Sequence, residues 1–222
     1  VGVCYFVYRD VVLAPQLHRN DFKHLYIGAY LAGHSASLYD PAEAFRVKEG
    51  LRIPGGLNPY VYPPFMAVLV KPLALFDYDT AWWIWCWFNN LLLLLTLGLL
   101  CRVVPEKDTL VKWATGILLF SLYEPIFRTV SAGQFNIVLL FAFTLAFLLL
   151  QKNRYFAAGA VLGLVAAAKV APAIFVIPFL LFERRALAGL IVSAVACTAV
   201  AVLVTGWDQH LAYLEVLQAM SY

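Results

Sequence analysis

The carboxylate of Asp21 is the first candidate for chemistry, because it lies at the start of a polar region that follows an apolar stretch. It belongs to Asn20-Asp21-Phe22, just where the sequence predicts a short helix over 22–33. A carboxylate in this position can act as a general base on an acceptor hydroxyl. Aspartate is also a favoured helix N-cap. The residues alone leave both roles open, and one aspartate can serve both.

Lys169 is the sharpest cationic candidate, because it separates two apolar segments, 156–168 and 172–182. A lysine within apolar sequence is costly to bury and is by default a functional-site hypothesis. The alternative is an anchoring role, in which the apolar stem lies along the protein and the ammonium group reaches water. We favour the functional interpretation, in which the ammonium group binds an anion.

Arg128 and the segment 133–136 flank a short loop between apolar runs. An arginine here indicates an anionic partner such as a phosphate group. Arg128 also lies four residues after Glu124, a spacing at which the two side chains can simply pair. Gln134 and Asn136 can hydrogen-bond sugar hydroxyls, or they can cap the helix that follows them.

Tyr60 and Tyr62 precede a short apolar segment over 63–76. Pro63 and Pro64 define the start and the direction of a helix there. Aromatic rings with a polar tip are common where a membrane meets water. From the residues alone, membrane anchoring is a better interpretation of the two tyrosines than substrate contact. We nevertheless include Tyr60 and Tyr62 among the predicted substrate-binding residues.

The composition predicts an all-α integral membrane protein. The chain has 222 residues, of which 63% are hydrophobic and 13% are charged. A soluble domain has about 45–50% apolar and about 25% charged residues. Apolar runs such as 81–101 and 186–205 approach the roughly 20 residues that cross a bilayer as a helix. The net charge of +3 is too small to indicate nucleic acid as a partner, and membrane lipids are the expected surroundings.

We expect a single transmembrane domain over 1–222, truncated at both ends relative to a longer protein. Residues 9–79 are predicted to form an outward-facing loop with short interfacial helices at 22–33 and 41–50. Residues 80–205 are predicted to contain about six membrane segments: 80–101, 112–127, 134–150 and 186–205 as clear spans, and 156–168 and 172–182 as shorter pieces.

Charge predicts the topology. Short basic loops at 102–112, 152–154 and 183–185 belong in the cytoplasm by the positive-inside rule. All three share a side only if 63–76 does not cross the membrane. The candidate site residues then all face outward.

No metal or cofactor is predicted. The cysteines and histidines lack paired or metal-ligand spacing. We interpret the cysteines as small buried residues. The residues concerned are Cys4, Cys86, Cys101, Cys197, His18, His24, His34 and His210.

The ordered set of these motifs resembles glycosyltransferase family 87. The set is Asn20-Asp21-Phe22, Gly33 to Leu38-Tyr39-Asp40, Tyr62-Pro63-Pro64-Phe65, Gly133-Gln134-Phe135-Asn136, and Gly163 to Lys169 and Pro172. The resemblance covers essentially the whole sequence. It implies a GT-C-type transmembrane bundle, whose outward-facing site takes a sugar from a lipid-linked donor, with Asp21 as the catalytic base.

The family includes polyprenol-phosphate-mannose-dependent α-1,2-mannosyltransferases. The resemblance therefore implies transfer of a hexose, mannose by preference, from a polyprenyl-phosphate donor to a hydroxyl of a lipid or glycan acceptor. The reaction would take place on the extracytoplasmic face of the plasma membrane. A polyprenyl phosphate is a good leaving group, so one base and one or two cations suffice, and a single displacement inverts the anomeric centre. Lys169 and Arg128 supply the cations.

A multi-pass transporter or flippase of lipid-linked sugars is the alternative. Lys169 near Pro172 fits the broken helices of such proteins, whereas the long outer loop and the lack of a visible repeat do not.

Overall fold

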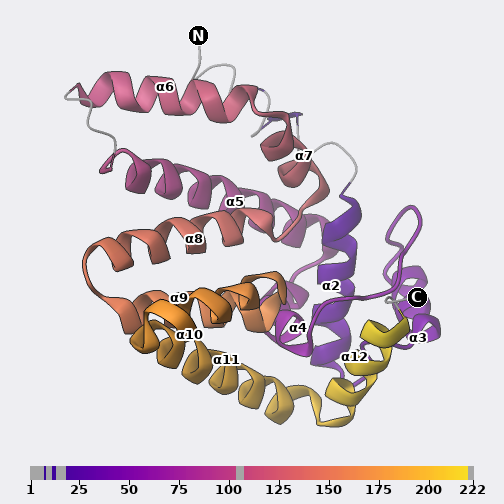
Figure 1. Ribbon diagram of the computed structural model, residues 1–222. Helices are drawn as coiled ribbons and strands as arrows, with labels where there is room; N and C mark the ends of the chain where they lie inside the picture. Colours follow the sequence, from indigo (N-terminus) through magenta and orange to yellow (C-terminus); the bar gives the residue numbers. More distant parts are fainter. Residues whose placement is uncertain (1–7, 9–11, 14–18, 104–107, 220–222) are drawn as a thin grey trace. The chain divides into compact units, whose positions relative to one another are not determined.

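Apolar runs separated by proline, glycine and charged residues form helices along the chain (Figure 1). The computed structural model describes residues 8, 12–13, 19–103 and 108–219. Within these ranges the regular elements are all helical, which confirms the predicted all-α class. The chain divides into two compact units, one from residues 1–22 and 82–152 and the other from residues 23–81 and 153–222.

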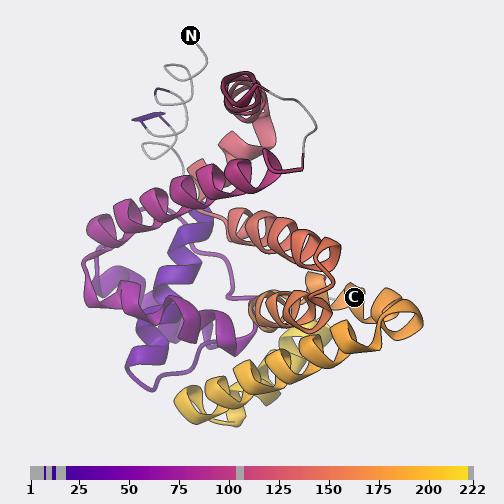
Figure 2. The ribbon, with the colours of Figure 1, turned by 90° about the vertical axis from the view of Figure 1, so that its left-hand side faces the viewer.

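The first unit is held together by apolar side chains from three helices. Leu92 and Leu93 of α5 form a buried cluster with Ile126 and Val130 of α7 and Ile137 of α8. Figure 2 shows these helices from a second direction. The helices of this unit are α5 (Tyr78–Leu100, here from Trp82 onward), α6 (Thr109–Leu122), α7 (Glu124–Ala132) and α8 (Asn136–Gln151).

A bend of 67° separates α6 from α7. Tyr123, between the two helices, has extended backbone angles (φ −81°, ψ 101°), and Pro125 occupies the first turn of α7. Proline lacks an N–H, and its ring clashes with the carbonyl group four residues earlier, so a helix cannot continue through it without distortion. The segment predicted as a span over 112–127 is therefore bent at Tyr123.

The second unit contains the surface helices and the C-terminal helices. Its α3 has the predicted bounds, with Pro41 in its first turn and Gly50 as its last residue. Its α4 is followed directly by a turn of 3₁₀ helix that contains Pro72. The elements are α2 (Asn20–Gly33, here from Lys23 onward), α3 (Pro41–Gly50), α4 (Pro64–Val70), η3 (Lys71–Leu75), α9 (Tyr155–Ala168), η4 (Ala171–Phe175), α10 (Val176–Phe182), α11 (Arg184–Thr205) and α12 (Asp208–Ala219).

Helices α9 and α11 form the closest helix pair of this unit, and α4 packs against both. A Cβ atom at Gly159 would collide with the carbonyl oxygen of Ala186, and one at Gly189 would collide with the carbonyl oxygen of Phe156. Small residues at helix interfaces allow such close backbone approach inside membranes. The two helices can therefore pack this closely only because Gly159 and Gly189 have no side chains.

A group of tyrosines, which we call the aromatic layer, joins the surface segments of the second unit. It consists of Tyr39, Tyr60, Tyr62 and Tyr213, with ring centroids 5.7–5.9 Å apart between neighbours. The Tyr39 hydroxyl donates to the Tyr62 carbonyl oxygen at 2.7 Å. The layer thus connects the loop after α2, the segment before α4, and α12.

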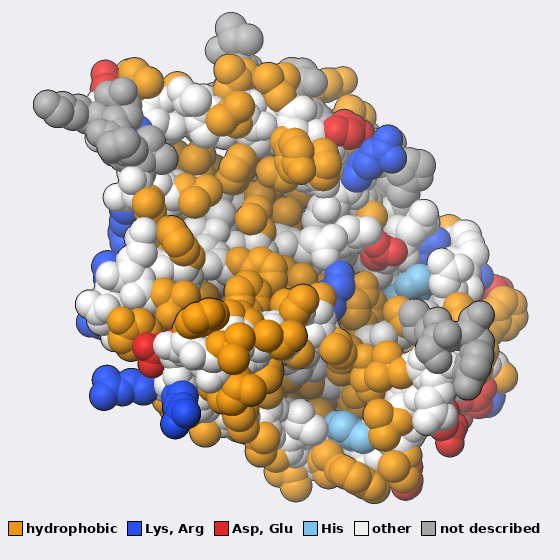
Figure 3. Space-filling model, viewed as in Figure 1, with side chains coloured by type: hydrophobic (Ala, Val, Ile, Leu, Met, Phe, Trp, Pro, Cys, Tyr) orange, Lys and Arg blue, Asp and Glu red, His pale blue; other side chains and the backbone are white. Residues whose placement is uncertain are grey.

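Two described helices, Tyr78–Leu100 and Arg184–Thr205, are long and apolar enough to cross a membrane, and the bent α6–α7 pair would make a third. Helices α8 and α9 are apolar but shorter, with 16 and 14 residues. Figure 3 shows apolar side chains over α10 and α11, where Leu181, Phe182 and Leu203 are among the most exposed hydrophobic residues. Apolar side chains on an outer helix surface are expected where lipid surrounds it.

Candidate functional site

Asp21 is the second residue of α2, where its side chain is half-buried. Its neighbour Phe22 is fully buried, with its ring centroid 5.1 Å from that of Trp82 and 6.4 Å from that of Trp85. This packing holds the first turn of α2 in place. Asp21 lies one residue inside α2, which begins at Asn20, so it is part of the first turn and does not precede the helix as an N-cap residue does.

Arg19 is a neighbouring cation that the sequence analysis did not select. Its guanidinium carbon lies 5.3 Å from the ring centroid of Trp82, a cation–π contact. Its backbone N–H donates to the carbonyl oxygen of Ser131 at 3.0 Å, and its φ is +46°. Two contacts and an unusual backbone angle thus fix the residue that leads into Asn20-Asp21. The available signal was its place two residues before the candidate base.

Gln134 and Asn136 are brought together in the first unit. The Asn136 amide donates to the Gln134 side-chain oxygen at 2.6 Å. The residue before α8 is Phe135, whose side chain makes no capping hydrogen bond. One amide N–H of Asn136 and the side-chain oxygen of Gln134 are bonded to each other, and the choice between capping the helix and binding sugar hydroxyls stays a prediction.

The turn that presents this pair is clamped by aromatic side chains. Gly133 adopts a left-handed conformation (φ +72°), and a Cβ there would come within 2.6 Å of both Phe22 and Trp82. The Trp85 indole N–H donates to the Gly133 carbonyl oxygen at 2.9 Å. Phe135, almost fully buried, stacks on Trp85 at 14°. Phe22 therefore anchors both the turn before α8 and the start of α2.

Arg128 lies on the exposed face of α7, and its side chain is 79% exposed. Its Nε donates to the Glu124 carboxylate at 3.1 Å, so the predicted i, i+4 ion pair is present. An exposed pair of this kind contributes about 0–1 kcal/mol to stability. It leaves most of the guanidinium fork accessible to an anion.

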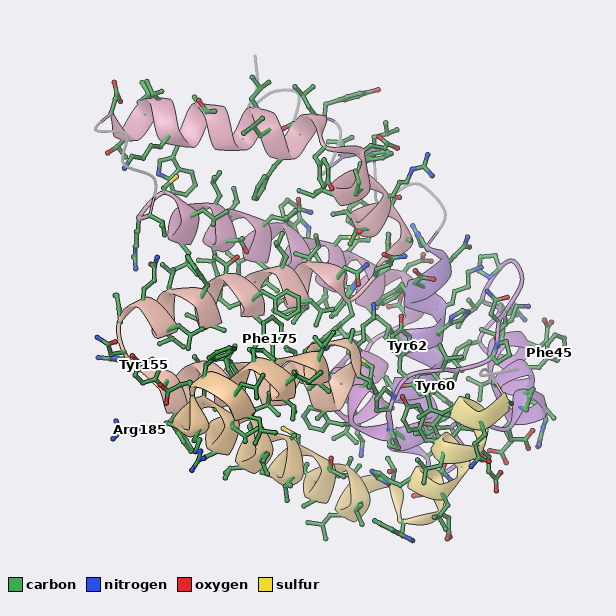
Figure 4. The ribbon with its side chains drawn as sticks, in the orientation of Figure 1. Phe45, Tyr60, Tyr62, Tyr155, Phe175 and Arg185 are labelled. Atoms are coloured by element: carbon green, nitrogen blue, oxygen red, sulfur yellow. The ribbon has the colours of Figure 1, made fainter. Side chains whose placement is uncertain are left out.

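Tyr60 and Tyr62 come together in the second unit, with ring centroids 5.7 Å apart (Figure 4). Tyr60 is only 6% exposed, which does not fit the anchoring role that was predicted for it. Its ring covers Gly28 of α2, where a Cβ would lie 2.6 Å from the ring. Its hydroxyl has no hydrogen-bond partner in the described part of the chain, although the Ala67 N–H approaches it.

The phenol groups of the aromatic layer are shielded from water. Burial raises the pKa of Tyr60 well above 10.0, and the neighbouring phenols of Tyr39 and Tyr62 raise it further. Burial likewise raises the pKa of Tyr39, with a further contribution from Tyr213. These hydroxyls therefore remain protonated donors and are unsuited to act as bases near neutral pH.

Lys169 ends α9 as its C-terminal cap, with an extended backbone (φ −147°) and a half-buried side chain. Its N–H donates to the Val165 carbonyl oxygen at 2.9 Å. A 3₁₀ turn with Pro172 follows, so Lys169 marks the break between α9 and α10.

Among the described residues no cluster of three or more histidine, cysteine, aspartate and glutamate side chains could hold a metal ion. The predicted site residues fall in both units: Asp21, Arg128, Gln134 and Asn136 in the first, and Tyr60, Tyr62 and Lys169 in the second.

Apolar helices of spanning length fit the class of helical membrane proteins. Comparison with known proteins narrows this class. The model of glycosyltransferase family 87 matches residues 60–221, and the chain belongs to that family.

One curated relative is the polyprenol-phosphate-mannose-dependent alpha-(1-2)-phosphatidylinositol pentamannoside mannosyltransferase of Mycolicibacterium smegmatis. It is 29% identical to this chain over 181 residues, which are 79% of this chain and 39% of the relative. The chain thus matches about two fifths of the length of that protein. No solved structure matches the present chain.

Proposed function

We propose that the protein transfers a hexose, mannose by preference, from a polyprenyl-phosphate donor to a hydroxyl group of a lipid or glycan acceptor. Family membership supports the transferase class, and the name of the mycobacterial relative supports the donor. The observation that carries the proposal is the Asp21 carboxylate, which lies in the first turn of α2 beside the buried Phe22.

The chemistry needs few groups. Asp21 takes the proton of the acceptor hydroxyl as its oxygen attacks the anomeric carbon, and the polyprenyl phosphate departs from the opposite face with the bonding electrons. A single displacement inverts the anomeric centre. Lys169 and Arg128 are the cations that balance the charge developing on the phosphate in this proposal, and we add Arg19 to them.

The proposed setting is a GT-C-type bundle in the plasma membrane, with the site on its extracytoplasmic face. Basic residues near the helix ends at 152–154 and 183–185 support a cytoplasmic location for those loops. The α4 helix, only seven residues long, supports a segment at 63–76 that lies on the membrane surface and does not cross it.

The test uses membranes that contain the full-length protein, incubated with polyprenyl-phosphate-[¹⁴C]mannose and a glycolipid acceptor. Asp21→Asn should reduce transfer to a few per cent of the wild-type rate or less, because removing a general base costs about 10²–10⁴-fold. Asp79→Asn is the matched control, since Asp79 is an aspartate in the first turn of α5. Normal transfer by Asp21→Asn at equal expression would refute the assignment.

The transporter or flippase alternative rests on the break between α9 and α10 at Lys169. The same assay separates the two functions. A transferase produces a radiolabelled glycolipid in detergent solution, where no membrane potential or sidedness exists. A flippase would move the intact donor between leaflets of sealed vesicles and form no new product.

A further inference from the structure

A cavity in the second unit lies beside the aromatic layer, between α3 and the segment that precedes Tyr60. Its volume is about 200 Å³, and Tyr39, Asp40, Phe45, Asn58 and Tyr60 contribute to its lining. The residues of the proposed transfer step, which are Asp21, Lys169, Arg128 and Arg19, do not line this cavity, whereas Tyr60 does. The transfer step therefore gives the cavity no function.

Three aromatic side chains, Tyr39, Phe45 and Tyr60, contribute to the walls of the cavity. The rings of Tyr39 and Tyr60 have centroids 5.7 Å apart, and both side chains are held by contacts within the unit. Phe45 extends from α3, as Figure 4 shows, and its side chain is 55% exposed. An exposed aromatic ring beside a cavity is a platform for a flat apolar face of a ligand.

The polar groups of the cavity are suited to hydroxyl groups. One carboxylate oxygen of Asp40 accepts the Ala42 N–H at 2.8 Å and caps α3. The other oxygen has no hydrogen-bond partner within the residues that the structure describes. Asn58 adds an exposed side-chain amide, since only its backbone N–H is used, toward His24 at 3.2 Å. A carboxylate repels phosphate groups, whereas it accepts hydrogen bonds from neutral hydroxyls.

We propose that this cavity is a pyranose-binding subsite, which holds one sugar ring of a substrate. The C–H face of the ring would lie on Phe45, and its hydroxyls would donate to Asp40 and hydrogen-bond with Asn58. The proposal rests on the proposed glycosyltransferase function for its choice of ligand. Either the acceptor glycan or the donor hexose supplies the same chemistry, and kinetics distinguish the two sources.

Two substitutions test the subsite in the purified full-length protein. Phe45→Leu removes the ring, and Asp40→Asn removes the charge while keeping a good helix cap. Each should raise the KM for one substrate by about tenfold, the loss expected for one such contact. The kcat should change little, because Asp21 is untouched.

The controls are matched in kind. Phe76→Leu alters another exposed phenylalanine of the same unit, and Asp77→Asn alters another capping aspartate, which accepts hydrogen bonds from Thr80. Both should leave KM unchanged. A rise in the KM for the acceptor assigns the cavity to the acceptor sugar, and a rise for the donor assigns it to the donor sugar. Unchanged KM values for both substrates in both variants overturn the subsite.

A binding measurement separates this proposal from the activity itself. Saturation-transfer NMR with methyl α-mannopyranoside should give a signal with the wild-type protein and with Phe76→Leu, and should lose most of it with Phe45→Leu. Binding without any transferase activity would leave the subsite in place and refute the proposed function. An equal signal in Phe45→Leu and wild type would refute the subsite whatever the activity.

Discussion

In the α9–α11 pair the contact is made by backbone atoms, whereas in the aromatic layer of the same unit it is made by rings and hydroxyl groups. Gly159 and Gly189 bring the two helix backbones together with no room for a further atom. Within the part of the chain that the structure describes, the Tyr60 hydroxyl has no hydrogen-bond partner, and a cavity lies beside Tyr39 and Tyr60. The α9–α11 contact has no room for a further atom, whereas the aromatic layer borders a space that can hold a ligand.

The difference separates scaffold from recognition. Backbone-to-backbone packing at Gly159 and Gly189 holds the N-terminal half of α9 against α11 to within the tolerance of a close contact, and Lys169 ends the same helix. The layer places polar groups around a space, where a ligand can satisfy them. Perturbing the first region should therefore affect folding, and perturbing the second should affect binding and pH dependence.

The largest effect is expected from Gly159→Val. The added side chain meets the Ala186 carbonyl oxygen, so α9 and α11 must separate. We expect a loss of about 3 kcal/mol in stability, at the upper end for overpacking. Gly50→Val is the control, because a Cβ there has no neighbour within 4 Å. Chromatography of heated, detergent-solubilised protein measures both, and equal heat resistance would show that the helices do not depend on this contact.

Substitutions of Lys169 test whether the residue that ends α9 has a function in transfer. Charge-assisted hydrogen bonds contribute about 1.5–3 kcal/mol, so Lys169→Gln should slow transfer by about tenfold to a hundredfold. Lys169→Arg should recover part of the rate, since the charge remains but the geometry changes. Lys152→Gln is the control, because Lys152 caps α8 as Lys169 caps α9. Near-normal rates in both Lys169 variants would identify a membrane anchor.

The aromatic layer should lose stability at alkaline pH. The pKa values of Tyr39 and Tyr60 are raised above 10.0 by burial, so the folded state keeps both phenols protonated while the unfolded chain ionises them. The stabilising contribution is complete below about pH 10 and declines above it, by up to about 1.4 kcal/mol per phenol for each pH unit.

Thermal unfolding between pH 8 and pH 11.5 measures this decline. Tyr60→Phe removes one ionisable group and should make the decline less steep. Tyr155→Phe, in which an exposed hydroxyl bonded to Asn153 is lost, should not. The same slope in wild type and in Tyr60→Phe would show that the Tyr60 phenol is accessible to water.

Local patterns predicted the surface helices well. Pro41 and Gly50 mark both ends of α3, and α2 begins within two residues of its predicted start. These signals act through residues adjacent in sequence. The bend at Tyr123 was missed because hydropathy continues across it, although Pro125 was visible as the cause. Helix α12 was not predicted, since it lies after the last predicted membrane segment, 186–205.

The candidate site was predictable in its residues and less so in their surroundings. The pairing of Gln134 with Asn136 and of Arg128 with Glu124 follows from short spacing. The burial of Tyr60 depends on Gly28, which lies far away in sequence, and no local pattern reports such a contact. Arg19 was missed for the same reason, since its significance comes from Trp82 and Ser131.

The smallest effect on stability is expected at the Glu124–Arg128 pair, which lies on α7, outside both the α9–α11 pair and the aromatic layer. The pair is exposed at both ends, so breaking it with Glu124→Gln or Arg128→Gln should change stability by less than about 1 kcal/mol. Transfer rates separate the two roles of Arg128. If it balances the donor phosphate, Arg128→Gln slows transfer, whereas Glu124→Gln keeps the guanidinium and releases it from its partner, so the rate is unchanged or higher. If the pair is only a surface contact, both variants transfer at the wild-type rate, and the phosphate role passes to Lys169 and Arg19.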